Sequence, residues 1–104
     1  MAEKKIIWTE KAKTSLFVIL DFYEKQNGSK SFSEKLFGEI ISETKILSNY
    51  DSLGKKTDFK NIRELVLNRN SIFYTETHES INIILVWDNR RNPKECYDLL
   101  KNKK

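Results

Sequence analysis

The chain has 104 residues, 38% of them hydrophobic and 33% charged, with three glycines and one proline. This composition is typical of one folded domain, which we place at residues 1–104, and it excludes both a disordered tail and two independent domains. The longest apolar run, Ile83–Trp87, is far shorter than the roughly 20 residues that cross a bilayer, and the N-terminus has no pattern of a secretory leader. We therefore expect a cytoplasmic protein that does not bind a membrane.

The N-terminal segment has the pattern of a strand followed by a helix. Lys4–Trp8 is rich in β-branched and aromatic residues, and Thr9 is a residue type that favours a helix N-cap. In the helix predicted at 10–25, the apolar residues recur at the spacing of one helical face, at Ala12, Leu16, Ile19, Leu20 and Tyr23. Asn27-Gly28 favours the left-handed conformation of a helix C-terminus, so we expect the helix to end there.

A second helix is expected to begin at Ser31. Ser31 and Glu34 have the spacing of a capping box, in which the hydroxyl and the carboxylate each satisfy a free backbone N–H group. The apolar side of this helix is predicted to contain Leu36, Phe37, Ile40, Ile41, Thr44, Leu47 and Tyr50. Two consecutive helices of this kind predict an antiparallel hairpin that covers a sheet, where each large buried side chain contributes about 1.5–3 kcal/mol.

The second half of the chain is predicted to contain a loop and three strands. The loop spans 51–60, where the residues are polar and show no periodicity. The strands are expected at Ile62–Leu67, Ser71–Thr77 and Ile81–Trp87, with turns at 68–70 and 78–80. Alternation in the first strand places Ile62 and Glu64 on one face and Arg63 and Leu65 on the other. The third strand is almost wholly apolar, as expected for a central strand covered on both faces.

Pro93 predicts the start of a C-terminal helix, expected at Pro93–Lys101, because proline fits the first helical turn and cannot continue a central strand. The element order is then β-α-α-β-β-β-α. This order predicts an α+β fold of two layers, in which an antiparallel-rich sheet packs against the N-terminal helical hairpin.

The net charge of +4 comes entirely from the second half of the chain. Residues 1–52 carry eight lysines and arginines against eight acidic residues, and residues 53–104 carry eleven against seven. A surplus of positive charge favours a polyanion such as a nucleic acid, which gains affinity through counterion release. An acidic protein would be attracted equally well, and charge alone does not separate the two kinds of partner.

Four segments of the second half occur in a recognisable order. They are Ile62-Arg63-Glu64-Leu65-Val66, Ser71-Ile72-Phe73-Tyr74, the apolar strand Ile81–Trp87, and Asp88-Asn89-Arg90-Arg91-Asn92-Pro93. Together with the element order, they resemble the RelE/ParE superfamily of bacterial type II toxins. The resemblance implies a toxin held inactive in a hetero-oligomer with a cognate antitoxin. It also implies one of two targets, because RelE-like members cut mRNA on the ribosome and ParE-like members poison DNA gyrase. Fold alone does not choose between them.

Metal-free RNA cleavage needs a group that activates the 2′-hydroxyl, cations at the phosphate and a proton donor for the leaving oxygen. By resemblance to RelE-like nucleases, Arg91 would hold the phosphate, and Tyr97 would stack on a base or take part in proton transfer. The second-strand arginine of those nucleases falls on Val66, and Arg69 in the following turn is the nearest substitute. One expected cation is therefore missing or displaced, and the candidate catalytic set is Arg91, Tyr97 and Arg69.

Five further cations are candidates for binding nucleic acid or antitoxin: Lys55, Lys56, Lys60, Arg63 and Arg90. The lysines lie in the polar loop, where a solvated surface is the commoner role. Arg63 is equally consistent with an ion pair across the sheet. An antitoxin of amphipathic helical character is expected to cover the exposed sheet edge and the basic face. A third interpretation is a non-toxic module that acts with its antitoxin as a transcriptional co-repressor.

The rarer residue types have ordinary structural interpretations. Cys96 is the only cysteine, so it forms no internal disulfide, and with one histidine the chain has no Cys/His set for zinc. We expect Cys96 to be a small, partly buried residue and His78 to be exposed in a turn instead of acting as a general base. Trp8 and Trp87 are expected in the core, although either could stack on a base. We predict neither a metal nor a cofactor.

Overall fold

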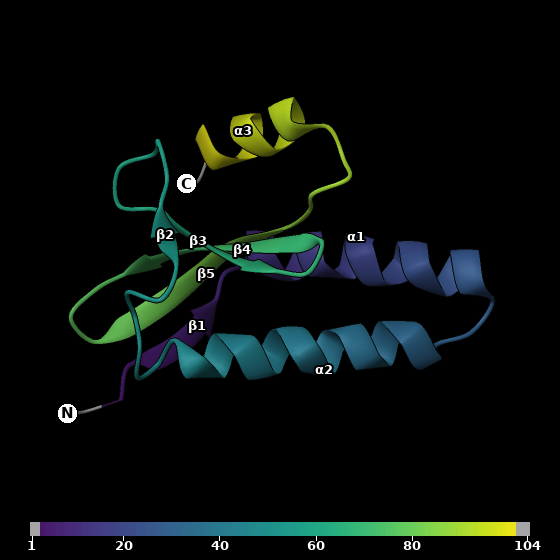
Figure 1. Cartoon of the computed structure of the whole chain (residues 1–104), viewed down its shortest axis with the longest axis horizontal. Coiled ribbons are helices and arrows are strands. Elements are labelled where there is room, and N and C mark those ends of the chain that lie inside the picture. Colours follow the sequence, from purple (N-terminus) through teal and green to yellow (C-terminus); the bar gives the residue numbers. More distant parts are fainter. Residues whose placement is uncertain (1–2, 102–104) are drawn as a thin grey trace.

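The computed structural model describes residues 3–101 (Figure 1). The elements are, in chain order, β1 Lys5–Trp8, α1 Glu10–Asn27, α2 Ser31–Ile46, β2 Lys55–Lys56, β3 Arg63–Leu67, β4 Asn70–Glu76, β5 Ser80–Asp88 and α3 Pro93–Lys101. The predicted α+β fold, a helical hairpin packed on an antiparallel-rich sheet, is confirmed. None of the helices within this range combines the length and the hydrophobicity needed to cross a membrane.

The five strands form one sheet in the order β1-β5-β4-β3-β2. β1 runs parallel to β5, whereas the pairs β5–β4, β4–β3 and β3–β2 are antiparallel. A parallel neighbour requires a long crossover, and here the whole helical hairpin and three strands lie between β1 and β5. β5 is buried along nearly its whole length, as its apolar sequence predicts.

The first hydrophobic core lies between the helical hairpin and one face of the sheet. The residues that α1 buries there are Ala12, Leu16, Ile19 and Tyr23. Thr9 caps α1, because its Oγ1 accepts a hydrogen bond from the Ala12 N–H at 3.1 Å. The same hydroxyl donates to the carbonyl of Ile83 at 2.9 Å, which ties the start of the helix to β5. Gly28 ends the helix with φ 69°, the left-handed conformation that the sequence predicts.

The second core lies on the opposite face of the sheet, under α3 (Figure 1). Its members are Ile62, Phe73, Ile84, Leu85, Trp87, Cys96 and Leu100, with Phe59 packed against them. The expected two layers therefore become three where α3 crosses the sheet. Within this short helix only Cys96 and Leu100 are buried, so its attachment depends on few side chains.

A bulge in β5 decides which of its side chains reach the second core. Consecutive residues of β4 pair with Ile83 and Leu85, so Ile84 between them has no partner. Ile83 faces the helical hairpin, and Trp87 faces α3. Strict alternation would have placed both on one face, because residues four apart in a regular strand share a face. The extra residue therefore places Trp87 on the α3 side.

The predicted capping box at the start of α2 is wrong. The N-cap residue is Lys30, which has helical torsions of φ −90° and ψ −8° and makes no side-chain cap. Ser31 is already helical, and its Oγ lies 3.1 Å from the Oγ of Ser29. A capping box needs an N-cap residue with extended backbone, and the short connection after Gly28 does not provide one.

Expectations about the covered face of α2 and about the segment that follows it are corrected. Phe37 and Tyr50, predicted on the covered face, are exposed at 46% and 66%. Tyr50 falls beyond the end of α2 at Ile46, so helical spacing does not apply to it. The predicted loop at 51–60 contains β2, whose Lys55 and Lys56 pair with β3. That pairing is non-local, so periodicity does not reveal it.

Tyr74 in β4 fixes the segment between α2 and β3. Its side chain is fully buried, and its hydroxyl accepts from the Gly54 N–H at 2.8 Å and donates to the Asp51 carbonyl at 2.8 Å. Burial raises the pKa of the Tyr74 phenol, so the hydroxyl remains a proton donor at neutral pH. The segment held in this way carries residues 57–59 to the face of the sheet that α3 covers.

Candidate functional site

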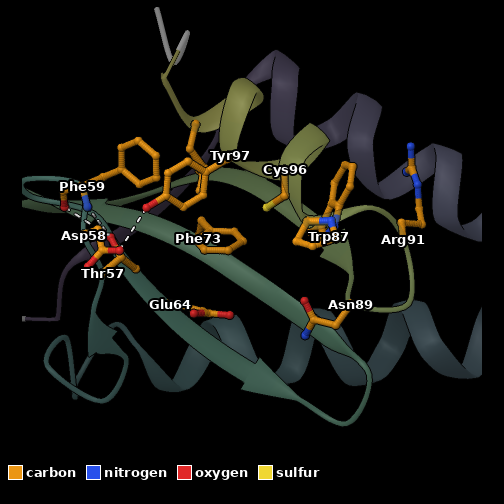
Figure 2. A pocket seen from close by; sticks show the side chains of 12 residues that line it. Thr57, Asp58, Phe59, Glu64, Phe73, Trp87, Asn89, Arg91, Cys96 and Tyr97 are labelled. Carbon is orange, nitrogen blue, oxygen red and sulfur yellow. Dashed lines mark hydrogen bonds between the residues drawn. The ribbon is translucent and has the colours of Figure 1, made fainter.

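A cavity of about 310 Å³ lies between α3, the sheet and residues 57–59 (Figure 2). We call it the α3 cavity. Its lining residues are Thr57, Asp58, Phe59, Glu64, Phe73, Trp87, Asn89, Arg91, Pro93, Cys96, Tyr97 and Leu100. Four aromatic rings and a small number of polar groups therefore face the same space, which is the usual composition of a binding site.

Arg91 reaches the α3 cavity because the chain turns sharply after β5. The carbonyl of Asp88 accepts a hydrogen bond from the Arg91 N–H at 2.9 Å, which closes a turn. The Arg91 guanidinium then lies over the indole of Trp87, with its carbon 4.2 Å from the ring centre. Its contact with Glu95 is long, at 4.0 Å, and both side chains are well exposed, so this pair contributes little. Arg91 is therefore held mainly by the cation–π contact.

Tyr97 lies at the opposite end of the α3 cavity from Arg91 (Figure 2). Its hydroxyl donates to Oδ2 of Asp58 at 3.0 Å, and its ring centre lies 4.7 Å from that of Phe59. The hydrogen bond to Asp58, and the negative charge of that carboxylate, raise the pKa of the Tyr97 phenol. The site thus holds Tyr97 in its protonated form.

Two carboxylates and a buried thiol complete the polar surface of the α3 cavity. Glu64 accepts a hydrogen bond from Ser71, which also accepts from Nδ2 of Asn89 at 2.9 Å. Burial, with a smaller contribution from the charge of Glu64, raises the pKa of the Cys96 thiol to about 11. Cys96 is therefore a neutral, packed thiol, as predicted. Within residues 3–101, no three His, Cys, Asp or Glu side chains are grouped so that they could hold a metal ion.

Arg90 makes different contacts from Arg91. Its guanidinium binds the buried carboxylate of Asp88, with Nη2 2.8 Å from Oδ2, and it also donates to the hydroxyl of Tyr23. It lines a separate hollow of about 440 Å³ formed with Val18 and Phe22 of α1. Arg91 also lines this hollow, so the two neighbouring arginines have different binding partners but share a surface.

The other candidate cations do not line the α3 cavity. Arg63 pairs with Glu76 at 3.3 Å and donates to the Gly54 carbonyl at 2.7 Å, so it has the cross-sheet pairing that the sequence left open. Lys56 and Lys60 line a neighbouring hollow with Arg63, and Lys55 is exposed on β2. Arg69 is exposed in the β3–β4 turn. Of the eight predicted site residues, Arg91 and Tyr97 are the two that line the α3 cavity as the structure describes it.

Sequence reasoning missed the acidic half of the α3 cavity. Glu64 was available from alternation, because it shares a face with Ile62, and Ile62 packs in the second core. Asp58 had no comparable signal, since its position depends on how Tyr74 fixes the preceding segment. The expectations for His78 and Trp87 are confirmed, the first exposed in a turn and the second only 3% exposed. Trp8 is half-buried at the edge of the first core.

A tyrosine titration tests the contact between Tyr97 and Asp58. In Asp58→Ala we expect the pKa of Tyr97 to fall toward the ordinary value of about 10, because the acceptor and its charge are both removed. Because folding raises this pKa, the contact stabilises the fold fully below about pH 10, and its contribution is lost as the pH rises through the folded value. The difference in tyrosinate absorbance between each protein and its Tyr97→Phe form isolates this residue. Glu79→Gln is the control, and an unchanged midpoint in Asp58→Ala would contradict the geometry.

Comparison with known proteins gives a family and a fold. The family model described as ParE toxin of type II toxin-antitoxin system, parDE, matches residues 6–93. Comparison with curated proteins gives no match. One similar solved structure is a chain described as the chromosomal ParDE TA system from P. aeruginosa, with a TM-score of 0.72 and 23% sequence identity, covering 81% of this chain and 94% of that chain. At this identity the structural likeness supports the fold alone.

Proposed function

This chain belongs to the ParE toxin family of type II toxin–antitoxin systems, and from that premise we propose that it inhibits growth by binding DNA gyrase in the cytoplasm. The resemblance to ParE-like toxins implies this target. In this proposal the toxin inhibits gyrase by binding to it and does not cut RNA.

The observation that carries the proposal is the charge of the α3 cavity, where a RelE-like nuclease site would have to lie. Among the lining residues that lie within 3–101, Arg91 is the one cation, and Asp58 and Glu64 are two carboxylates. Cleavage of RNA adds negative charge at the phosphorane, which needs a surplus of cations to stabilise it. The carboxylates oppose that charge, so the cavity disfavours a phosphate.

The hydrogen bond and the pKa of Tyr97 also argue against RNA cleavage. Its proton is donated to Asp58, and the raised pKa of the phenol makes it a poor base at neutral pH. A general acid needs its proton directed at the leaving oxygen, within hydrogen-bond reach. Arg69, the third candidate for catalysis, does not line the α3 cavity.

Ribosome-dependent mRNA cleavage is the second candidate function, and one observation favours it. Arg91 and Tyr97, the two residues carried over from RelE-like nucleases, line the same cavity. If this candidate is correct, Arg91→Ala abolishes cleavage of mRNA on ribosomes and leaves the fold intact.

We also propose that a cognate antitoxin covers the groove between α1 and α2, in a hetero-oligomer. The groove is lined by Trp8, Leu16, Phe17, Leu20, Phe37 and Ile41, with Lys13 at its margin. Phe17 is 72% exposed and Phe37 is 46% exposed. Large apolar side chains exposed together in one groove mark a surface that a protein partner covers. An amphipathic helix with its own apolar stripe fits such a groove.

The test separates the two targets in one design. The toxin is expressed from an inducible promoter while DNA synthesis, protein synthesis and mRNA integrity are followed in parallel, and purified toxin is added to a gyrase supercoiling assay. We expect DNA synthesis to stop first, supercoiling to be inhibited in proportion to toxin, and mRNA to stay intact. His78→Ala, in an exposed turn, is the matched control and should inhibit as the wild type does.

Three results would decide against the proposal. Normal supercoiling at toxin concentrations that arrest growth excludes gyrase as the target. Cleaved mRNA that depends on Arg91 supports the nuclease instead. Normal growth at full expression supports the third interpretation, a non-toxic co-repressor that acts with its antitoxin.

A further inference from the structure

The described lining of the α3 cavity contains two carboxylates, Asp58 and Glu64, although the chain as a whole is basic. Asp58 and Glu64 each accept a hydrogen bond from a hydroxyl group, of Tyr97 and Ser71 respectively. Within residues 3–101 neither carboxylate forms an ion pair, and the ion pairs present join other side chains. Asp58 is exposed and Glu64 is half-buried, and among the described lining residues these two carboxylates face one arginine, so the lining has a net negative charge.

A second and independent observation in the same cavity also indicates a missing partner. Trp87 is only 3% exposed, yet its indole Nε1 has no hydrogen-bond acceptor in the described part of the chain. Buried N–H groups without an acceptor are rare, and each costs stability. Trp87 forms part of the cavity wall, and the nitrogen-bearing edge of its ring is turned toward the side on which Asn89 lies (Figure 2).

The aromatic walls favour a flat, positively charged occupant. The rings of Phe59, Phe73, Trp87 and Tyr97 line the space between the two carboxylates and Arg91. Trp87 already carries one guanidinium on its face, that of Arg91 at 4.2 Å, so a planar cation is accepted by this kind of surface. Aromatic faces combined with carboxylates are the surroundings that a guanidinium prefers, because it stacks and donates at the same time.

We propose that the α3 cavity binds an arginine side chain presented by a protein partner. The proposal depends on the proposed function, in which the toxin acts by binding a protein. The guanidinium donates to Asp58 and Glu64. Its positive charge, together with that of Arg91, balances the two negative charges of these carboxylates. Trp87 Nε1 is closed to solvent in this structure, and a movement of the indole on binding would let a main-chain carbonyl of the partner accept its hydrogen bond. A phosphate group would instead have to lie beside two carboxylates.

The two tryptophans of the chain provide the measurement. Isotope-labelled toxin is titrated with N-acetyl-arginine amide, and the two indole N–H signals are followed by NMR. Trp87 reports on the α3 cavity, and Trp8, which lines the groove between α1 and α2, is the internal control. Trp87→Phe assigns the signals by removing one of them. N-acetyl-citrulline amide has nearly the same shape without the charge and is the matched probe.

We expect the arginine probe to move the Trp87 signal and not the Trp8 signal, and the citrulline probe to move neither. Asp58→Asn and Glu64→Gln keep the size of each side chain and should each weaken binding by at least about tenfold. Glu79→Gln removes one carboxylate from an exposed turn outside the cavity and should leave the affinity unchanged.

The proposal is overturned if the Trp87 signal does not respond, or if both probes move it equally. It is also overturned if guanosine monophosphate moves Trp87 and the carboxylate variants bind this nucleotide as the wild type does, since the cavity would then be a nucleotide site. The supercoiling assay is independent of this titration. If the toxin binds the arginine probe but does not inhibit gyrase, the arginine site stands and the gyrase proposal fails. If the toxin inhibits gyrase but does not bind the probe, the gyrase proposal stands and the arginine site fails.

Discussion

Trp87→Ala is expected to lower the free energy of unfolding by about 3–5 kcal/mol, a large part of the roughly 5–15 kcal/mol of a typical domain. Trp87 is the largest side chain of the second core and also supports the guanidinium of Arg91. Since α3 buries only Cys96 and Leu100, loss of the indole removes much of the surface on which this helix rests. We therefore expect the amide hydrogens of residues 94–101 to exchange faster in Trp87→Ala than in the wild type, and those of α1 to change less.

Urea denaturation followed by circular dichroism measures the loss, and hydrogen exchange locates it. Trp87→Phe is the matched control, because it keeps an aromatic ring and removes the N–H group that has no acceptor. We expect it to cost about 1–2 kcal/mol. Equal losses in the two variants would show that packing of the ring is not what stabilises the second core. Unchanged exchange in α3 would show that the helix is held by other contacts.

The parts of the fold that the sequence predicted well are those specified by neighbouring residues. Thr9 and Gly28 bound α1 because capping and left-handed torsions are properties of one or two residues, and Pro93 begins α3 for the same kind of reason. The alternation of β3 was also readable, with Ile62 and Glu64 on the α3 face and Leu65 on the other. Local chemistry decides these features, so a single sequence contains them.

The parts that the sequence did not predict depend on contacts between distant segments. The bulge at Ile84 is invisible in an apolar run, since every residue there suits either face. β2 pairs with β3, and the Tyr74 hydroxyl binds Gly54 next to β2, so the path of the chain toward Asp58 depends on contacts between distant residues. Alternation could place Glu64 on the α3 face, but the sequence alone could not place Asp58 beside Tyr97.

The same contrast between local sequence and distant contacts explains why Arg90 and Arg91 bind different partners. Arg90 and Arg91 are adjacent in sequence, and a surplus of positive charge suggests that both face one partner. The turn after β5 gives them different partners, Asp88 and Tyr23 for Arg90 and Trp87 for Arg91, although both line the hollow beside α1. Net charge describes the average field of a protein, whereas a site depends on which cations share a surface.

Two glycines provide the second prediction with a large effect, and they are expected to respond in opposite directions. A Cβ at Gly54 would lie 2.6 Å from the hydroxyl of Tyr74, 2.7 Å from its ring and 3.0 Å from the Glu64 carbonyl. Tyr74 is fully buried and cannot move aside. Gly54→Ala should therefore cost about 2–4 kcal/mol, through overpacking and the loss of the hydrogen bonds to the hydroxyl.

Gly38→Ala is the matched control, because nothing lies within 4 Å of a Cβ at this exposed position inside α2. Alanine there should stabilise the protein by about 1 kcal/mol, since it restricts the unfolded chain and favours the helix. Urea denaturation of both variants measures the contrast. Combining Gly54→Ala with Tyr74→Phe adds a sharper test, because removing the hydroxyl removes the closest contact. The two changes should then cost less together than the sum of their separate losses, and strict additivity would contradict the contact that holds residues 57–59 against the α3 cavity.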